Sequence, residues 1–202
     1  LTILGLMSGI LFLMAYTPLG YLNIGPLAVT FNVIPVAVCA IVLGPTGGAI
    51  AGAVFGLTSF MQAIGIGGVS ALGSALFQIN PFMTAVQCFG PRILDGICIG
   101  FIYRAVHKKA NTYVSCAVTG FFSAFLNTLF FMTALIVMFG NTELIRNLMG
   151  GHNIIVGCCL MVGVNAISEM VSSTIITAAV GTALSKAHLI PASQIAKPDT
   201  AA

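Results

Sequence analysis

Long apolar stretches follow one another along almost the whole chain, and short segments rich in Pro, Gly or Asn interrupt them. A helix needs about 20 apolar residues to cross a bilayer, and such punctuation separates one span from the next. The Gly- and Ser-rich stretch at 64–80 has room for a short interfacial helix near 71–77. The pattern predicts six spans, at about 2–16, 28–43, 47–63, 81–106, 113–139 and 154–184.

Composition points the same way. The 202 residues are 58% hydrophobic and include only 7 Lys and Arg and 4 Asp and Glu. A soluble domain would carry about a quarter charged residues, and one of this size leaves about a third of its surface outside. We therefore expect an all-α integral membrane protein, a compact bundle of six transmembrane helices.

Basic residues mark the cytoplasmic side of membrane proteins. They gather between the fourth and fifth predicted spans, at Arg104, Lys108 and Lys109, and again after the sixth, at Lys186. Both termini are then expected in the cytoplasm. The domain boundaries that follow are a transmembrane domain at 1–188 and a cytoplasmic tail at 189–202.

Three polar loops are expected on the outer side under this topology, at 17–27, 64–80 and 140–153. A purely structural bundle would connect its helices as briefly there as it does at Gly44-Pro45 on the inner side. Long loops of this kind commonly carry function. They indicate a cover over an outward-facing pocket.

Ionisable side chains inside membrane spans are costly and usually functional. Arg92 lies about ten residues from the outer end of the fourth span, roughly 15 Å deep. Asp95 follows at i+3 on the same helix face and would neutralise it in an internal ion pair. Alternatively, Arg92 presents its planar donor fork to a ligand carboxylate or carbonyl. The sequence leaves both interpretations open.

Further polar side chains recur in several spans and in the outer loops. They either cross-link helices through hydrogen bonds or converge on one outward-opening cavity. Glu169, with Asn165 one turn before it, is the other candidate beside Arg92, and the two could pair across the bundle. The candidate substrate-binding residues are Tyr21, Asn32, Gln62, Asn80, Arg92, Asn127, Asn165 and Glu169.

Small residues four apart allow two helices to approach closely. Gly5 and Gly9 form such a pair in the first span, and Gly48, Gly52 and Gly56 repeat the spacing in the third. The pattern fits packing within the chain as well as packing against a partner.

Catalytic and metal-binding motifs do not occur in the sequence. It contains no GxxxxGK[ST] phosphate loop, no H-E-x-x-H and no G-x-S-x-G, so ATP hydrolysis and other catalysis by this chain are not expected. The six Cys lie in apolar stretches without metal-ligand spacing and are expected to be packing residues. No metal, directly bound cofactor or nucleic acid is predicted.

A family resemblance rests on a set of short motifs across 1–184. The chain resembles the substrate-binding S components of energy-coupling factor (ECF) vitamin transporters. The motifs are Leu6-Met7-Ser8-Gly9, Thr17-Pro18-Leu19-Gly20-Tyr21, Gly25-Pro26, Pro35, Leu43-Gly44-Pro45 with Gly47 and Gly52, Gly56-Leu57-Thr58-Ser59-Phe60 and Gly90-Pro91-Arg92-Ile93-Leu94.

The resemblance implies a vitamin site near the outer face and a place in a bacterial cytoplasmic membrane. It also implies docking on a transmembrane coupling subunit driven by two ATPase subunits, which hydrolyse the ATP. The family's small-residue coupling motif, often Ala-x-x-x-Ala, falls on Gly5 and Gly9, which differ in identity but not in size.

The substrate indicated by the resemblance is pantothenate, because the loop at 17–21 is similar to the pantothenate-type branch. Arg92 would suit its carboxylate, and Asn127, Asn165 and Glu169 its hydroxyls and amide. Riboflavin or another vitamin is the alternative substrate. An autonomous small transporter is one alternative class. An intramembrane enzyme using Glu169 and His152 is another, but these residues lie about 25 Å apart along a helix, which is poor geometry for a joint catalytic site.

Overall fold

The computed structural model describes residues 2–17, 21–24, 27–67, 70–148 and 154–190, with the backbone alone for 21–24, 27–29, 148, 154–162 and 164. Helices dominate, and one two-stranded antiparallel hairpin joins the first two. The helices are α1 (Thr2–Tyr16), α2 (Val33–Ala63), α3 (Ala71–Ile79), α4 (Pro81–His107), α5 (Thr112–Phe139), α6 (Glu143–Leu148) and α7 (Ile154–Lys186), and the strands are β1 (Tyr21–Ile24) and β2 (Leu27–Thr30).

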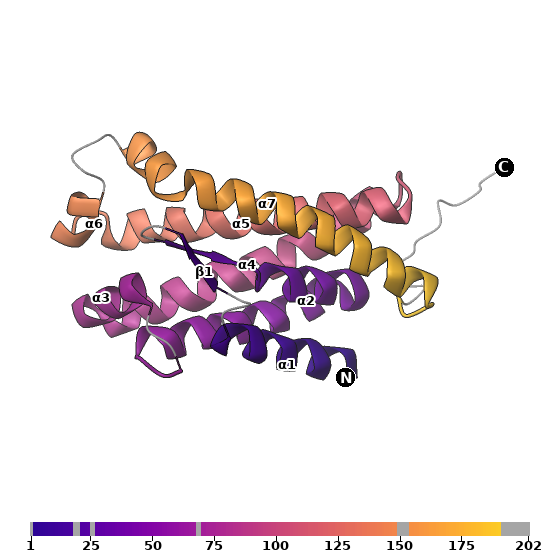
Figure 1. Cartoon of the computed structure of the whole chain (residues 1–202), viewed down its shortest axis with the longest axis horizontal. Helices are drawn as coiled ribbons and strands as arrows, with labels where there is room; N and C mark the ends of the chain where they lie inside the picture. Colours follow the sequence, from indigo (N-terminus) through magenta and orange to yellow (C-terminus); the bar gives the residue numbers. More distant parts are fainter. Residues whose placement is uncertain (1, 18–20, 25–26, 68–69, 149–153, 191–202) are drawn as a thin grey trace.

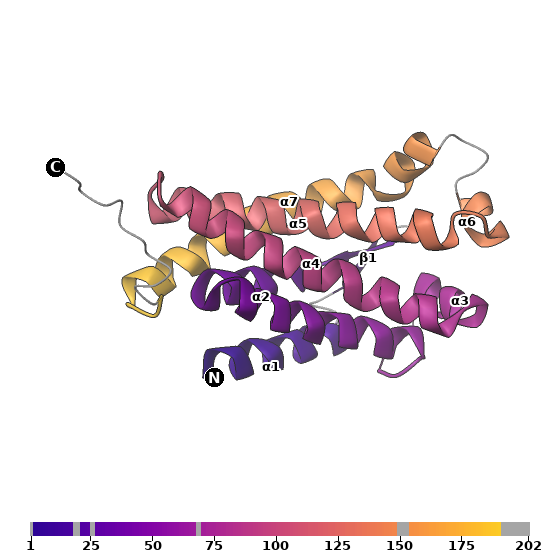
Figure 2. The ribbon, with the colours of Figure 1, turned by 180° about the vertical axis from the view of Figure 1, so that it is seen from behind.

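The long helices lie side by side in an elongated bundle (Figure 1). The short helices α3 and α6 lie together at one end, and α7 ends at the other. Seen from behind, α4 lies between α2 and α5 (Figure 2). The interfacial helix predicted near 71–77 is present as α3.

Among the described residues, four helices are long and apolar enough, by length and composition, to cross a membrane: Val33–Ala63 taken as one element, Pro81–His107, Thr112–Phe139 and Asn165–Lys186. The apolar helix Thr2–Tyr16 is shorter. The chain is therefore a multi-pass membrane protein. Several large apolar side chains on these helices are exposed, including Phe82 at 77% and Val137 at 79%, as expected where the solvent is lipid.

The helix α2 consists of two halves that meet at Gly44. Gly44 has φ 75° and ψ −164°, a backbone conformation that only glycine adopts readily, and Pro45 starts the second half. A Cβ on Gly48 would lie 3.0 Å from the Cβ of Ala40, so the halves run back alongside each other. The turn predicted at Gly44-Pro45 is present.

The second predicted span begins later than expected. The apolar pattern predicts a start near residue 28, but 27–30 form strand β2, and the helix begins at Val33. Strands Tyr21–Ile24 and Leu27–Thr30 pair with each other, which satisfies their backbone groups. An apolar run alone does not distinguish a strand from a helix, and the β-branched residues Val29 and Thr30 favour a strand here.

The first half of α2 is the centre of the bundle. Every residue from Val33 to Val42 is less than 9% exposed. Its side chains pack against Leu11 of α1, Phe55 of the second half, Ile99 of α4 and Ala124 of α5. This helix is enclosed by protein rather than lipid.

The second half of α2 packs against α4 through glycine. A Cβ on Gly48 would collide with the backbone of Gly96, and a Cβ on Gly52 with the carbonyl of Arg92. A Cβ on Gly56 would lie 2.9 Å from the Cys88 carbonyl oxygen. The small residues of the predicted third span thus bring two helices of the same chain together.

Candidate functional site

Asn32 and Asn127 are brought to the same level of the bundle. The Ser123 hydroxyl of α5 donates to the carbonyl oxygen of Val33 at 3.2 Å. Asn32 precedes Val33, and Asn127 lies one turn beyond Ser123. The two amide side chains therefore approach from the start of α2 and the middle of α5.

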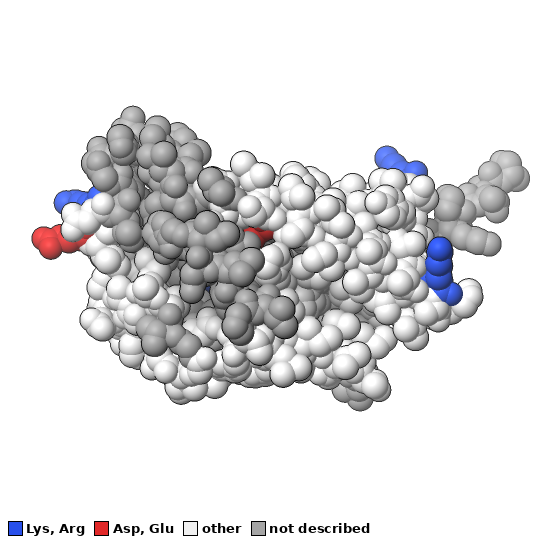
Figure 3. Space-filling view, in the orientation of Figure 1, with Lys and Arg blue, Asp and Glu red and all other residues white. Residues whose placement is uncertain are grey.

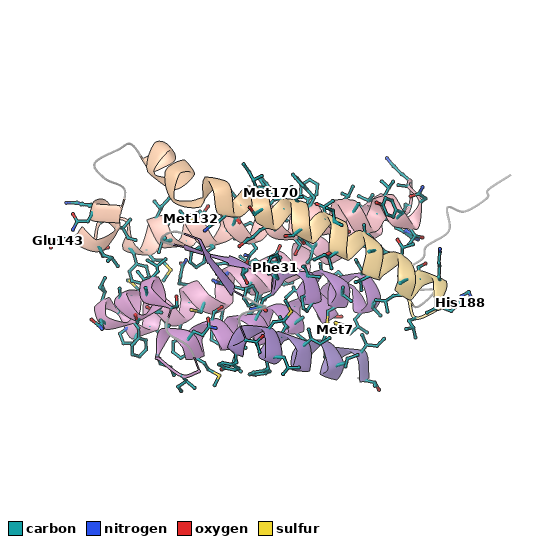
Figure 4. The ribbon with its side chains drawn as sticks, viewed as in Figure 1. Met7, Phe31, Met132, Glu143, Met170 and His188 are labelled. Carbon is teal, nitrogen blue, oxygen red and sulfur yellow. The ribbon has the colours of Figure 1, made fainter. Side chains whose placement is uncertain are left out.

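Arg92 and Glu169 join this level from α4 and α7. The Arg92 guanidinium lies 4.6 Å from the ring centre of Phe131, which is one turn beyond Asn127. Glu169 accepts a hydrogen bond from the backbone N–H of Thr30, two residues before Asn32. Phe31 lies between Thr30 and Asn32 in the sequence, and Met170 follows Glu169. Their labels in Figure 4 mark this level near the middle of the bundle's length.

The Arg92 side chain is held in a defined position. Its guanidinium lies over the rings of Phe131 and Phe55, at 4.6 and 5.3 Å from their centres, an arrangement worth about 2 kcal/mol when desolvated. Nη1 donates to the Gln87 carbonyl oxygen at 2.9 Å. Nε is buried and has no hydrogen-bond partner among the described residues.

The Arg92–Asp95 pair does not form an ion pair within the part of the chain that the structure describes. Asp95 is 2% exposed, and one of its carboxyl oxygens has no partner among those residues. It lies beside Gly96, where α4 meets the second half of α2. Arg92 instead turns toward the phenylalanine rings.

Buried amides complete the site. Asn32 is fully buried, and neither its Oδ1 nor its Nδ2 has a hydrogen-bond partner within the described segments. Asn127 is 6% exposed, and its Oδ1 is likewise unpaired there. A buried polar group without a partner costs about 1–3 kcal/mol. These groups are suited to a ligand that carries both donors and acceptors.

Other predicted site residues have structural hydrogen bonds. The Gln62 amide donates to the carbonyl oxygen of Ala15 at 2.7 Å and ties the ends of α1 and α2. Asn80 accepts from the Met83 N–H at 3.1 Å and caps α4, one of the functions that Asn commonly serves.

The remaining candidate residues lie close to this level or outside the part of the chain that the structure describes. Asn165 is 6% exposed and lies one turn from Glu169 on α7. The backbone of Tyr21 pairs with Thr30 in the hairpin, but its side chain falls outside the described part. His152 lies outside the described residues altogether.

Sequence reasoning missed Gln87. This residue is 1% exposed, and its Nε2 donates to the Phe131 carbonyl oxygen at 2.8 Å. Its Oε1 has no partner among the described residues. A buried amide five residues before Arg92 in an apolar span was a usable signal, whereas nothing in the sequence marked Phe55 or Phe131.

The geometry defines a membrane-embedded binding protein: several helices direct an arginine, and amides without a partner in the described part of the chain, into one buried level. The family described as "ECF transporter, substrate-specific component" matches residues 1–181. The chain belongs to this family, so it is the substrate-binding component of a transporter and not an enzyme.

Two relatives are similar to the chain over most of its length. A pantothenate transporter PanT of Leuconostoc mesenteroides is 33% identical over 178 residues, which cover 85% of this chain and 81% of the relative. A pantothenic acid transporter PanT of Lactococcus lactis is 29% identical over 180 residues, covering 83% and 84%.

Proposed function

We propose that this chain is the pantothenate-specific S component of an ECF importer. The observation that carries the proposal is the buried level formed by Arg92, Asn32 and Asn127. Their polar groups that lack a partner among the described residues include both donors and acceptors. Pantothenate offers a carboxylate for the guanidinium and an amide and hydroxyls for the side-chain amides. The names of the two relatives support the same substrate.

The proposed docking surface for the coupling subunit is the face of α1 that points away from the bundle. A Cβ on Gly5 or Gly9 would meet no atom of the described residues within 4 Å. Leu6 and Leu13 on the same helix are 61% and 67% exposed. An open, small-residue face of this kind suits close approach of a partner helix in lipid. Two ATPase subunits of the assembly would then supply the energy.

The proposed topology has six spans, with both termini in the cytoplasm of a bacterial cell. Lys and Arg side chains appear at the end of the bundle where α7 terminates (Figure 3). That end fits the positive-inside rule. Glu143 and the helix α6 lie at the opposite end, in Figure 4 as in Figure 1.

Thiol labelling of intact cells tests the topology. A Lys109→Cys thiol should be reached by an impermeant reagent only after the membrane is opened, and an Asn141→Cys thiol at once. The unsubstituted chain gives the background from native cysteines. Labelling of position 109 from outside would contradict the proposed orientation.

Calorimetry tests the substrate. The full chain in lipid nanodiscs should bind pantothenate more tightly than riboflavin and more tightly than the pantothenate amide, which lacks the carboxylate. Tighter binding of riboflavin would replace the substrate. Uptake of pantothenate into liposomes by this chain alone would point to an autonomous transporter and overturn the assembly.

A further inference from the structure

Glu169 forms a hydrogen bond that joins distant parts of the chain. Its Oε1 accepts from the backbone N–H of Thr30 at 2.6 Å, across 139 residues of sequence. Both residues are buried, at 5% and 9% exposure. A buried backbone N–H left without its acceptor costs about 1–3 kcal/mol. The bond therefore fastens the end of β2 to α7.

Thr30 makes a second contact that leads toward the site. Its Oγ1 accepts from the backbone N–H of Asn32 at 3.3 Å. Asn32 stands at the start of α2 but makes no side-chain cap hydrogen bond to that helix. Its amide is instead buried and unpaired among the described residues. The contacts run in order from Glu169 through Thr30 to Asn32.

We propose that Glu169 is a positioning residue: its carboxylate fixes Thr30, and Thr30 holds Asn32 so that the amide faces the substrate. Asn32 makes the substrate contact, and Glu169 acts through it. This inference rests on the proposed function for the identity of the substrate. The fastening of Thr30 itself belongs to the protein without substrate.

The first measurement is hydrogen exchange of the Thr30 amide in the full chain in nanodiscs, without pantothenate. Glu169→Met keeps the length of the side chain but removes the acceptor, and should speed exchange roughly 10- to 100-fold. Glu169→Gln keeps an acceptor oxygen and should change the rate much less. Thr174→Val removes an α7 hydroxyl whose hydrogen bond goes to the Met170 carbonyl and not to Glu169, and it should leave the rate unchanged.

The second measurement is the affinity for pantothenate in a double-mutant cycle. Glu169→Met and Asn32→Leu should each weaken binding about tenfold, and the double variant should bind no more weakly than Asn32→Leu alone. Thr30→Val keeps the N–H but removes Oγ1. It should preserve slow exchange at position 30 and still weaken binding, by roughly threefold.

Three results would overturn the inference: unchanged Thr30 exchange in Glu169→Met, additive losses in the cycle, or equal losses of affinity in Glu169→Gln and Glu169→Met. The last would identify Glu169 as a direct ligand through its charge. A wild-type chain that fails to bind pantothenate would overturn the proposed function, while the exchange rates would still decide whether Glu169 fastens Thr30.

Discussion

Two glycine patterns with the same spacing have opposite surroundings in this molecule. Gly48 and Gly52 in α2 face the backbone of α4 so closely that neither has room for a Cβ. Gly5 and Gly9 in α1 face space that no described residue occupies. The spacing therefore indicates that another helix can approach this helix face closely. It does not indicate whether that helix belongs to the same chain or to a partner. Only the fold distinguishes a face already occupied from one still available.

The largest effect is expected from filling the closed contact. Gly52→Ala would place a methyl group against the Arg92 carbonyl, and we expect a loss of about 1–3 kcal/mol or more. Thermal unfolding in detergent measures it. Gly9→Ala, which adds the same methyl group on α1 where no described atom lies within 4 Å, is the matched control and should not destabilise. Equal behaviour of the two variants would contradict the close contact.

Filling the open face should spare the fold and block coupling. Gly9→Leu is not expected to destabilise the fold, because the side chain enters space free of described atoms and a helical glycine is removed. Pantothenate binding by the isolated chain should persist, while ATP-driven uptake by the assembled transporter is lost. If binding fails but the complex still assembles, this glycine packs the bundle itself.

Arg92 separates the two kinds of contact within one residue, since its backbone meets Gly52 and its side chain faces the site. Arg92→Lys keeps the charge but loses the planar fork. Binding of pantothenate should weaken by roughly 1.5–3 kcal/mol, with the fold intact. Asp95→Asn should alter affinity less. Calorimetry with pantothenate and its amide decides, since equal affinities in the wild type would remove Arg92 from the site.

The smallest effect is expected at Gly5. Gly5→Ala adds one methyl group in open space and removes the backbone entropy of a helical glycine. Stability should rise by about 0.5–1 kcal/mol, measured by thermal unfolding, with unchanged affinity for pantothenate. A loss of stability would mean that α1 is packed more tightly here than the structure has it.

Local chemistry made part of the fold predictable. The dipeptide Gly44-Pro45 predicted the turn within α2. The dipeptide Asn80-Pro81 predicted the start of α4, because a capping residue followed by proline marks a helix start in the local sequence. The hairpin at 21–30 was not predicted. Its apolar residues resemble the start of a span, and strand pairing depends on a partner segment.

The site was predictable only in part, for a related reason. Counting residues along the spans placed Arg92 and Asn127 at depth. It did not reveal that the Gln62 amide is bound to a carbonyl 47 residues away, or that two phenylalanine rings enclose the guanidinium. Such pairings arise from tertiary packing and have no local signature.

The shortness of the first half of α2 has a consequence for biogenesis. From Val33 to Leu43 the helix rises roughly 16 Å, about half the hydrocarbon thickness of a bilayer. It cannot hold a transmembrane position in lipid alone, so it must enter the membrane together with the second half, as a helical hairpin folded at Gly44. The helices that enclose it, α4, α5 and α7, leave the ribosome later. The segment at the centre of the finished bundle is therefore inserted before most of the helices that pack around it have been synthesised.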